Sequence, residues 1–229
     1  MSKPYMIAIT GGSGSGKSTL AQALLDKLGE DKVLLMGEDN YYKPREHQHP
    51  DAPLWSMKEM EERVDFDDPA SKNMDMYEAH LVALRRGSTI SQPVYDFTMH
   101  DRVDGAEKIL SPRPIIVCEG VHTLSDRAYF NLFDLTIFVD TPADLRLARR
   151  IERDVNERNR DLDRVLAQYL NFVRPAHAQF TEPAKYLCDL IIKDEGPLAA
   201  KVGTPNARAE ARLLAPLWSF LVDEGVIAG

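Results

Sequence analysis

Residues 9–20 read ITGGSGSGKSTL and contain the spacing G-x-x-x-x-G-K-S, from Gly11 to Ser18. A short apolar run at 5–10 precedes the motif, and a helical pattern at 17–28 follows it. Glycines tolerate positive φ and let backbone N–H groups close around phosphate oxygens, while the helix directs its positive end at the same point. A strand, a glycine loop and a helix in this order predict a phosphate-binding P-loop rather than a flexible Gly/Ser turn.

The P-loop residues have predicted roles toward a nucleotide and Mg²⁺. Lys17 would neutralise the β- and γ-phosphates, and the Ser18 hydroxyl would bind Mg²⁺. Mg²⁺ needs a further oxygen ligand, for which Glu119 and Asp140 are candidates at the ends of apolar runs. Glu119 precedes Gly120 and is the predicted ligand, whereas Asp140 is expected to be structural, near a helix start. The expected nucleotide-binding set is Gly11, Gly12, Ser13, Gly14, Ser15, Gly16, Lys17, Ser18 and Thr19.

The composition limits the class of protein. With 229 residues, the chain is long enough for one α/β domain with a full core. The net charge of −8 argues against a general nucleic-acid binder. The apolar runs are far shorter than the roughly 20 residues of a membrane helix, and the N-terminus has no secretory pattern. Cys118 and Cys188 lie in apolar runs and are expected to be reduced. We therefore expect a cytoplasmic protein without a membrane or nucleic-acid partner.

Five apolar runs have strand length and lack polar alternation, which is typical of strands buried on both faces of a parallel sheet. They lie at 5–10, 33–36, 115–119, 135–140 and 190–193. Helical patterns cover 17–28, 74–86, 142–156, 162–172 and 207–222. Thr141 is the expected cap of the third helix, and the fourth is expected to end before Arg174 and Pro175. This β-α-β order predicts a doubly wound α/β fold.

A P-loop occurs in kinases, GTPase switches and motor ATPases. The guanine-reading motif N-K-x-D is absent from the sequence, and a motor ATPase usually needs more residues. A small kinase needs an acceptor pocket, a group that orients or deprotonates the acceptor hydroxyl, and mobile arginines that offset transition-state charge. Arginines do recur at helical spacings of three and four, at Arg146, Arg149, Arg150 and Arg153.

Two segments are candidates for the acceptor-binding parts of such a kinase. Residues 40–110 have scattered proline, many charges and weak periodicity, which predicts an insertion that covers a substrate. The arginine pattern is also that of an ion-paired surface helix, but its position after the fourth strand favours a lid over about 142–172. We therefore expect 1–229 to form a single P-loop kinase domain with this insertion and an arginine-rich lid.

Residues 37–43 read GEDNYYK and place Asp39 just after the second apolar run. The end of that strand lies at the carboxyl edge of the sheet next to the P-loop, where ligands bind in open α/β folds. A carboxylate there can orient an acceptor hydroxyl and accept its proton, and Tyr41 and Tyr42 can wall a sugar. A turn-forming role for Asp39 is the alternative.

Eight segments together resemble the uridine kinase (uridine–cytidine kinase) family, from about residue 6 to residue 193. They read GGSGSGKST, EDNYYK, VDFDDP, PVYDFTMHDR, IIVCEG, IFVDTPADLRLARRIERDVNERNRDLDRVLAQY, VRPAHAQF and CDLII. The resemblance implies phosphorylation of the 5′-hydroxyl of uridine, and of cytidine, to the monophosphate in pyrimidine salvage. It also implies ATP (alternatively GTP) as donor, Mg²⁺ as cofactor, and a homo-oligomer that is commonly a tetramer.

The resemblance assigns roles to individual residues. The general base falls on Asp39, the ribose-binding aspartate on Asp67, and the magnesium carboxylate on Glu119. Together with Lys17 of the P-loop and Arg153, which matches a lid and substrate residue of the family, Asp39 forms the expected catalytic set. The remaining substrate residues are Tyr42, Tyr95, Phe97, His100, Arg150, Arg158, Arg160 and Gln168. A neutral His100 imidazole is a donor or an acceptor according to its tautomer, so it would face either uracil or cytosine.

The chain departs from the family pattern in places. The family commonly reads FDHP with DAFD soon after, where this chain reads FDDPASKN at 66–73. Asn159 stands where glycine is usual and is expected in the left-handed conformation, and His122 has no assigned role. A phosphoribulokinase-like or pantothenate-kinase-like enzyme is the first alternative, and a nucleotide-binding regulator without turnover is the second.

Overall fold

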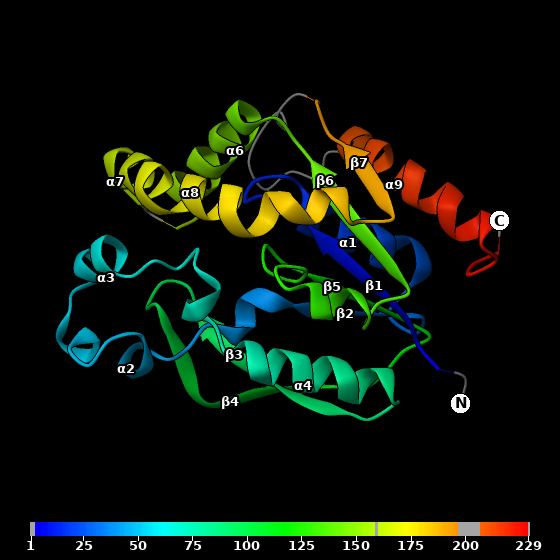
Figure 1. The fold of residues 1–229 in the computed structure, drawn as a ribbon, viewed down its shortest axis with the longest axis horizontal. Helices are drawn as coiled ribbons and strands as arrows, with labels where there is room; N and C mark the ends of the chain where they lie inside the picture. Colours follow the sequence, from blue (N-terminus) through cyan, green and yellow to red (C-terminus); the bar gives the residue numbers. More distant parts are fainter. Residues whose placement is uncertain (1–2, 159, 197–206, 229) are drawn as a thin grey trace.

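The computed structural model describes residues 3–158, 160–196 and 207–228. Within them a parallel sheet of five strands has the order β2-β5-β1-β6-β7, which confirms the predicted α/β fold (Figure 1). The strands are β1 Tyr5–Thr10, β2 Val33–Gly37, β5 Ile115–Glu119, β6 Leu135–Asp140 and β7 Leu190–Lys193. The central β1 has β5 and β2 on one side and β6 and β7 on the other, so successive strands are added in opposite directions from β1. This switch leaves a crevice at the carboxyl edge of the sheet, where the P-loop follows β1.

Helices cover both faces of this sheet (Figure 1). The longer ones are α1 Lys17–Leu28, α4 Met74–Arg85, α6 Ala143–Asn156 and α9 Ala207–Asp223. The short ones are α2 Arg45–Gln48, α3 Met57–Arg63, α5 Arg127–Phe130, α7 Leu162–Gln168 and α8 Arg174–Ala176. Short 3₁₀ segments are Glu38–Tyr41, Ala52–Leu54, Pro69–Ser71 and Glu182–Tyr186, and π-helical segments are Tyr169–Val173 and His177–Thr181.

The alternation of side chains along β1 divides the core into two layers. Ile7 and Ile9 are buried with α1 and α9 on one face, whereas Met6 and Ala8 are buried with α4 on the other. Cys118 belongs to the second layer and Cys188 packs against it, and both are free thiols. A strand apolar on both sides is what a two-sided sheet requires.

The insertion between β2 and β5 carries α2, α3, α4 and an antiparallel hairpin of β3 Ile90–Asp96 and β4 Asp101–Leu110. The hairpin forms a separate two-stranded sheet in the part of the chain described. Figure 1 shows α3 and the tip of the hairpin at the same end of the molecule as α6 and α7. This arrangement leaves the insertion facing the arginine-bearing helix across the carboxyl edge of the sheet.

Two local predictions are wrong. Thr141 does not cap α6, because Pro142 occupies the N-cap position and the Thr141 hydroxyl donates to the Ser15 carbonyl oxygen at 2.9 Å. The helix from Leu162 does not end before Pro175 but continues in mixed helical segments to Tyr186. Since proline has no N–H to donate, the wider π-helical turns on both sides of α8 allow the chain to remain helical there.

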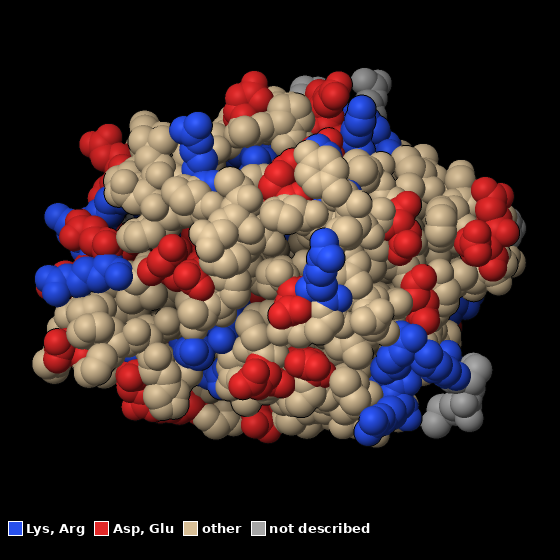
Figure 2. Space-filling model, in the orientation of Figure 1, with Lys and Arg blue, Asp and Glu red and all other residues tan. Residues whose placement is uncertain are grey.

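Acidic and basic side chains are interspersed over the face drawn in Figure 2, without one continuous basic area. None of the helices among residues 3–158, 160–196 and 207–228 is sufficiently long and apolar to span a membrane.

The first prediction concerns the contact between α1 and the sheet. Leu20 is fully buried in the core, so Leu20→Ala should lower the free energy of unfolding by about 2–5 kcal/mol. Chemical denaturation measures this change. Leu54→Ala is the control, since Leu54 is 86% exposed and should change stability by less than about 0.5 kcal/mol. Equal effects of the two changes would contradict the packing described.

Candidate active site

The P-loop has the backbone conformation that its glycines predict. Gly14 has a φ of 78° and Gly16 a φ of 97°, in the region where other residues are strained. A Cβ atom at Gly14 would lie 2.5 Å from the carbonyl oxygen of Arg146, so no larger residue fits between the loop and α6. Lys17 is buried and its Nζ donates to the Gly12 carbonyl oxygen at 3.0 Å. Burial lowers the pKa of Lys17, while Glu119 opposes that shift.

The predicted magnesium ligands lie beside each other. Parallel pairing of Ile9 with Glu119 brings the end of β5 next to the P-loop, and Ser18 Oγ donates to Glu119 Oε1 at 3.1 Å. Burial raises the pKa of Glu119, against the effect of Lys17. Two oxygens at the mouth of a phosphate cradle fit Mg²⁺, which usually keeps several waters and takes phosphate oxygens as its other ligands.

No group of three or more His, Cys, Asp or Glu side chains among the described residues is arranged to hold a metal ion. Asp140, the other candidate ligand, forms an ion pair with Lys185 at 2.8 Å. Any ion between Ser18 and Glu119 would therefore take its other ligands from a bound nucleotide and from water.

A single pocket brings together Asp39, Arg153 and all the substrate residues expected from the sequence. Its lining is Ser13, Asp39, Tyr42, Phe66, Asp67, Tyr95, Phe97, His100, Val121, Arg150, Arg153, Arg158, Arg160 and Gln168. Ser13 belongs to the P-loop, and the others come from the insertion, the loop after β5 and the segment of α6 and α7. Lys17, Ser18 and Glu119 are outside this lining. The pocket thus begins where the phosphate cradle ends.

One wall of the pocket is aromatic. The Tyr42 and Tyr95 ring centroids are 5.0 Å apart, and those of Tyr95 and Phe97 are 5.2 Å apart. Phe66, which sequence reasoning missed, stacks on His100 at 4.7 Å with an interplanar angle of 22°. His100 has a φ of 49°, in the left-handed region, and it belongs to the pocket lining. Flat apolar faces with polar edges suit a planar heterocycle.

The opposite wall is basic and is organised by one buried carboxylate. Asp154 is fully buried and forms ion pairs with four arginines. The nitrogen–oxygen distances are 2.8 Å for Arg153, 3.5 Å for Arg150, 3.5 Å for Arg158 and 3.5 Å for Arg160. Burial alone would raise the pKa of Asp154, but the arginines hold it below its ordinary value. In the sequence, Asp154 is one of several acids interleaved with arginine, so nothing singles it out.

A second acid connects the insertion to the arginine segment. Glu61 on α3 lies 3.3 Å from His100 Nε2 and 3.2 Å from Arg160 Nε. Arg160 also donates to Gln168 Oε1 at 3.1 Å, and Arg150 donates to the same oxygen at 2.7 Å. The edge of His100 is therefore already in polar contact, and Glu61 is a further residue that sequence reasoning missed.

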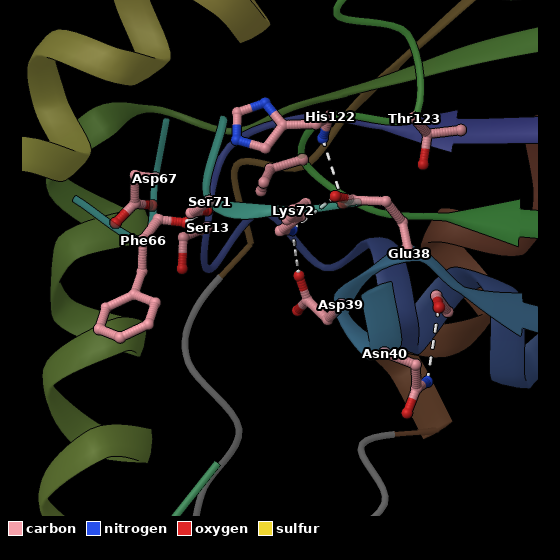
Figure 3. A network of polar contacts seen from close by, with 12 residues as sticks. Ser13, Glu38, Asp39, Asn40, Phe66, Asp67, Ser71, Lys72, His122 and Thr123 are labelled. Atoms are coloured by element: carbon pink, nitrogen blue, oxygen red, sulfur yellow. Dashed lines mark hydrogen bonds and ion pairs between the residues drawn. The ribbon is translucent and has the colours of Figure 1, made fainter. Parts of the chain in front are cut away.

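Asp39 lies in the 3₁₀ segment that follows β2, and its side chain is 49% exposed. Lys72 Nζ donates to Asp39 Oδ1 at 2.7 Å (Figure 3). Burial would raise the pKa of Asp39, but Lys72, with Lys17 and Arg158, holds it well below its ordinary value. Sequence reasoning also missed Lys72, because a single lysine in a polar segment carries no signal.

Two further positions noted in the sequence are His122 and Asn159. His122 is buried, and its ring nitrogens have no hydrogen-bond partner among the described residues; burial lowers its pKa to about 3. Its backbone N–H donates to Glu38 Oε2 at 3.3 Å. Asn159, the expected left-handed residue, lies outside the described residues.

A P-loop at the switch point of a parallel sheet, with a carboxylate and arginines around an adjoining pocket, defines the class of P-loop kinases. Such enzymes are phosphotransferases. The chain belongs to the Phosphoribulokinase / Uridine kinase family, whose model matches residues 6–197. Two relatives named uridine kinase are similar over most of their length. The one from Clostridium perfringens is 41% identical over 86% of this chain and 90% of its own. The one from Brevibacillus brevis is 42% identical over 86% and 87%.

Solved structures show the same fold at low identity. The phosphoribulokinase from Rhodobacter spheroides superposes with a TM-score of 0.58 and 17% identity, covering 88% of this chain and 76% of the other. A structure described as a possible uridine kinase from Bacillus stearothermophilus gives a TM-score of 0.57 and 17% identity, covering 83% and 89%. These likenesses establish the architecture and leave the acceptor open.

The second prediction concerns Asp154. Its ionised form stabilises the fold above the unfolded pKa of about 4, and this contribution is lost as the pH falls through the lower folded-state pKa. Asp154→Asn should therefore lower the free energy of unfolding at pH 7 by about 3–5 kcal/mol, because the buried Arg150 and three partly buried arginines lose their shared partner. Denaturation at a series of pH values measures this.

The difference between wild type and Asp154→Asn should narrow below about pH 4. Glu157→Gln, at an exposed position just after α6, is the control and should be neutral at every pH. A pH-independent difference would show that Asp154 acts through its shape and not its charge.

Proposed function

We propose that the protein transfers the γ-phosphoryl group of ATP, or alternatively GTP, to the 5′-hydroxyl of uridine and of cytidine. The observation that supports this most is the single pocket in which Asp39, the aromatic residues and the arginines meet beside the P-loop. The names of the relatives support uridine as the acceptor. We further propose that residues 40–110 act as a nucleoside-binding insertion, 142–172 as a lid, and 1–229 as one domain that assembles as a tetramer.

The transfer follows from the charges around the pocket. Asp39 accepts a hydrogen bond from the 5′-hydroxyl and takes its proton as the new O–P bond forms and the bond to the leaving diphosphate breaks. Lys17 and Arg153 offset the charge that develops on the transferred group. Ser18 and Glu119 would hold Mg²⁺, which neutralises phosphate charge when it is bound.

The aromatic and acidic residues of the insertion account for the acceptor in this proposal. Tyr95 and Phe97 contact the faces of the pyrimidine, and His100 contacts its edge. Asp67 accepts hydrogen bonds from the ribose 2′- and 3′-hydroxyls. Tyr42 walls the sugar between the base and Asp39, in line with its contact with Tyr95.

A sugar phosphate is the competing acceptor, because the same four arginines that surround Asp154 can bind an anionic group. Release of ADP from Mg-ATP, measured with each common nucleoside and several sugar phosphates, separates the two. The proposal expects turnover of uridine and cytidine. Turnover of a sugar phosphate with none of uridine would contradict it.

The third prediction tests the base. Asp39→Asn should retain nucleoside binding and lower kcat by about 10²–10⁴-fold, since proton transfer to a positioned group typically contributes that much. Steady-state kinetics with uridine measure it. Asp104→Asn, an exposed acid on the same insertion, is the matched control and should leave kcat unchanged. Near-normal kcat in Asp39→Asn would exclude Asp39 as the base.

The fourth prediction tests Asp67. 2′-Deoxyuridine should have a kcat/KM about 10- to 150-fold below that of uridine, because losing a hydrogen bond to a charged group costs about 1.5–3 kcal/mol. Asp67→Asn should reduce this discrimination by weakening binding of uridine more than that of deoxyuridine. Equal turnover of both nucleosides by the wild-type enzyme would show that Asp67 does not bind the 2′-hydroxyl.

A further inference from the structure

Lys72 is a buried charge that the proposed transfer does not use. It is only 2% exposed. Its ammonium group lies between two carboxylates, those of Glu38 and Asp39, and forms an ion pair with each (Figure 3). Burying a lysine is costly without such partners. One cation therefore connects the interior of the insertion with the carboxylate that faces the pocket.

Backbone hydrogen bonds fix the position of the Lys72 main chain. Tyr42 and Lys72 form an isolated antiparallel bridge. On one side of it, Lys43 N–H donates to the Ser71 carbonyl oxygen at 3.0 Å, and on the other, Asn73 N–H donates to the Tyr41 carbonyl oxygen at 2.8 Å. The segment that bears Lys72 is thus hydrogen-bonded, on both sides of the bridge, to the segment that follows Asp39.

Glu38 restrains the lysine from the side opposite Asp39. Its side chain is fully buried and has no free space beside it, because a Cβ atom at Gly120 would overlap Glu38 Oε2. That oxygen also accepts the His122 N–H. Lys72 Nζ lies 4.3 Å from the centroid of the Tyr42 ring, which closes a further side. The ammonium group has little room to leave its position.

The side chain of Asp39 is less restrained than that of Glu38. Its side chain is about half exposed to the pocket, and the terminal torsion of an aspartate has broad preferences. Lys72 occupies Oδ1, which leaves Oδ2 as the oxygen available to an acceptor hydroxyl. The geometry of proton transfer is demanding, and a misplacement of about 1 Å can cost about 10²-fold in rate.

We propose that Lys72, anchored by Glu38, is a positioning residue that holds Oδ1 of Asp39 and so directs Oδ2 at the incoming hydroxyl. This inference rests on the proposed function, because it requires that Asp39 act on the acceptor. Lys72 does not touch the substrate itself, since it is absent from the pocket lining.

The test removes both buried charges together. Lys72→Met alone would leave two uncompensated carboxylates and endanger folding. The double variant Lys72→Met/Glu38→Gln removes one charge of each sign and should keep a thermal midpoint close to that of the wild type. We expect its kcat for uridine to fall about 10²-fold with KM for uridine and ATP within about threefold. A merely structural role would change stability and leave kcat of the folded enzyme unchanged.

Two further variants complete the experiment. Lys108→Met, at an exposed position of β4, is the matched control and should leave kcat and stability unchanged. If the double variant does not fold, Lys72→Gln/Glu38→Gln replaces it, because the two amides can bond to each other in the buried site. The same 10²-fold loss of kcat is expected from it, and wild-type kcat in either folded variant would overturn the proposal.

A thermodynamic cycle separates this inference from the proposed function. In an Asp39→Asn background, loss of Lys72 and Glu38 should lower kcat by less than about threefold, because Lys72 acts through Asp39. A further loss of about 10²-fold there would overturn the positioning role. If Asp39→Asn alone retains kcat, the fault lies with the proposed base, and this outcome is distinct from a failure of the double variant.

Discussion

The buried charges around the pocket are compensated by opposite charges, and the site depends on this compensation. Asp154 is surrounded by four arginines, and Lys72 lies between Glu38 and Asp39. An unpaired charge at such depth would be neutralised or would unfold its surroundings. Lys72 thus joins two segments of the insertion that lie 33 positions apart in the chain, and the ion pair of Glu61 with Arg160 joins the insertion to the arginine segment.

Because of this compensation, the charged side chains on the two sides of the pocket are restrained in different ways. The arginine side is held by shared contacts, since Asp154 serves Arg150, Arg153, Arg158 and Arg160 together. An incoming phosphate competes with one carboxylate for several guanidinium groups, so individual arginines can turn to it without leaving Asp154 unpaired. The Asp39 side is more rigid, because backbone bonds and a buried ammonium group restrain it.

Local signals explain which parts could be predicted from the sequence. The five strands are apolar runs buried on both faces, and the P-loop has a fixed spacing of glycine, lysine and serine. Both can therefore be recognised from the local sequence, without knowledge of tertiary contacts. Lys72 and Glu61 could not be predicted, because their roles depend on partners distant in the chain. Asp154 could not be predicted either, because the sequence does not distinguish it from the nearby acids. The continued helix beyond Pro175 was missed because the proline rule considers only α-helical bonding.

The segment where the chain departs from its family pattern is also the one that places Lys72. Asp68, in the position of the usual histidine, accepts the Ala70 N–H at 2.7 Å and caps the 3₁₀ turn Pro69–Ser71. That turn carries the chain from Asp67, in the pocket lining, to Lys72, behind Asp39. One short turn thus connects a side chain of the pocket lining with one that contacts Asp39 from outside the lining. A change at Asp68 would therefore act on Asp67 and, through Lys72, on Asp39, although Asp68 itself is not in the pocket lining.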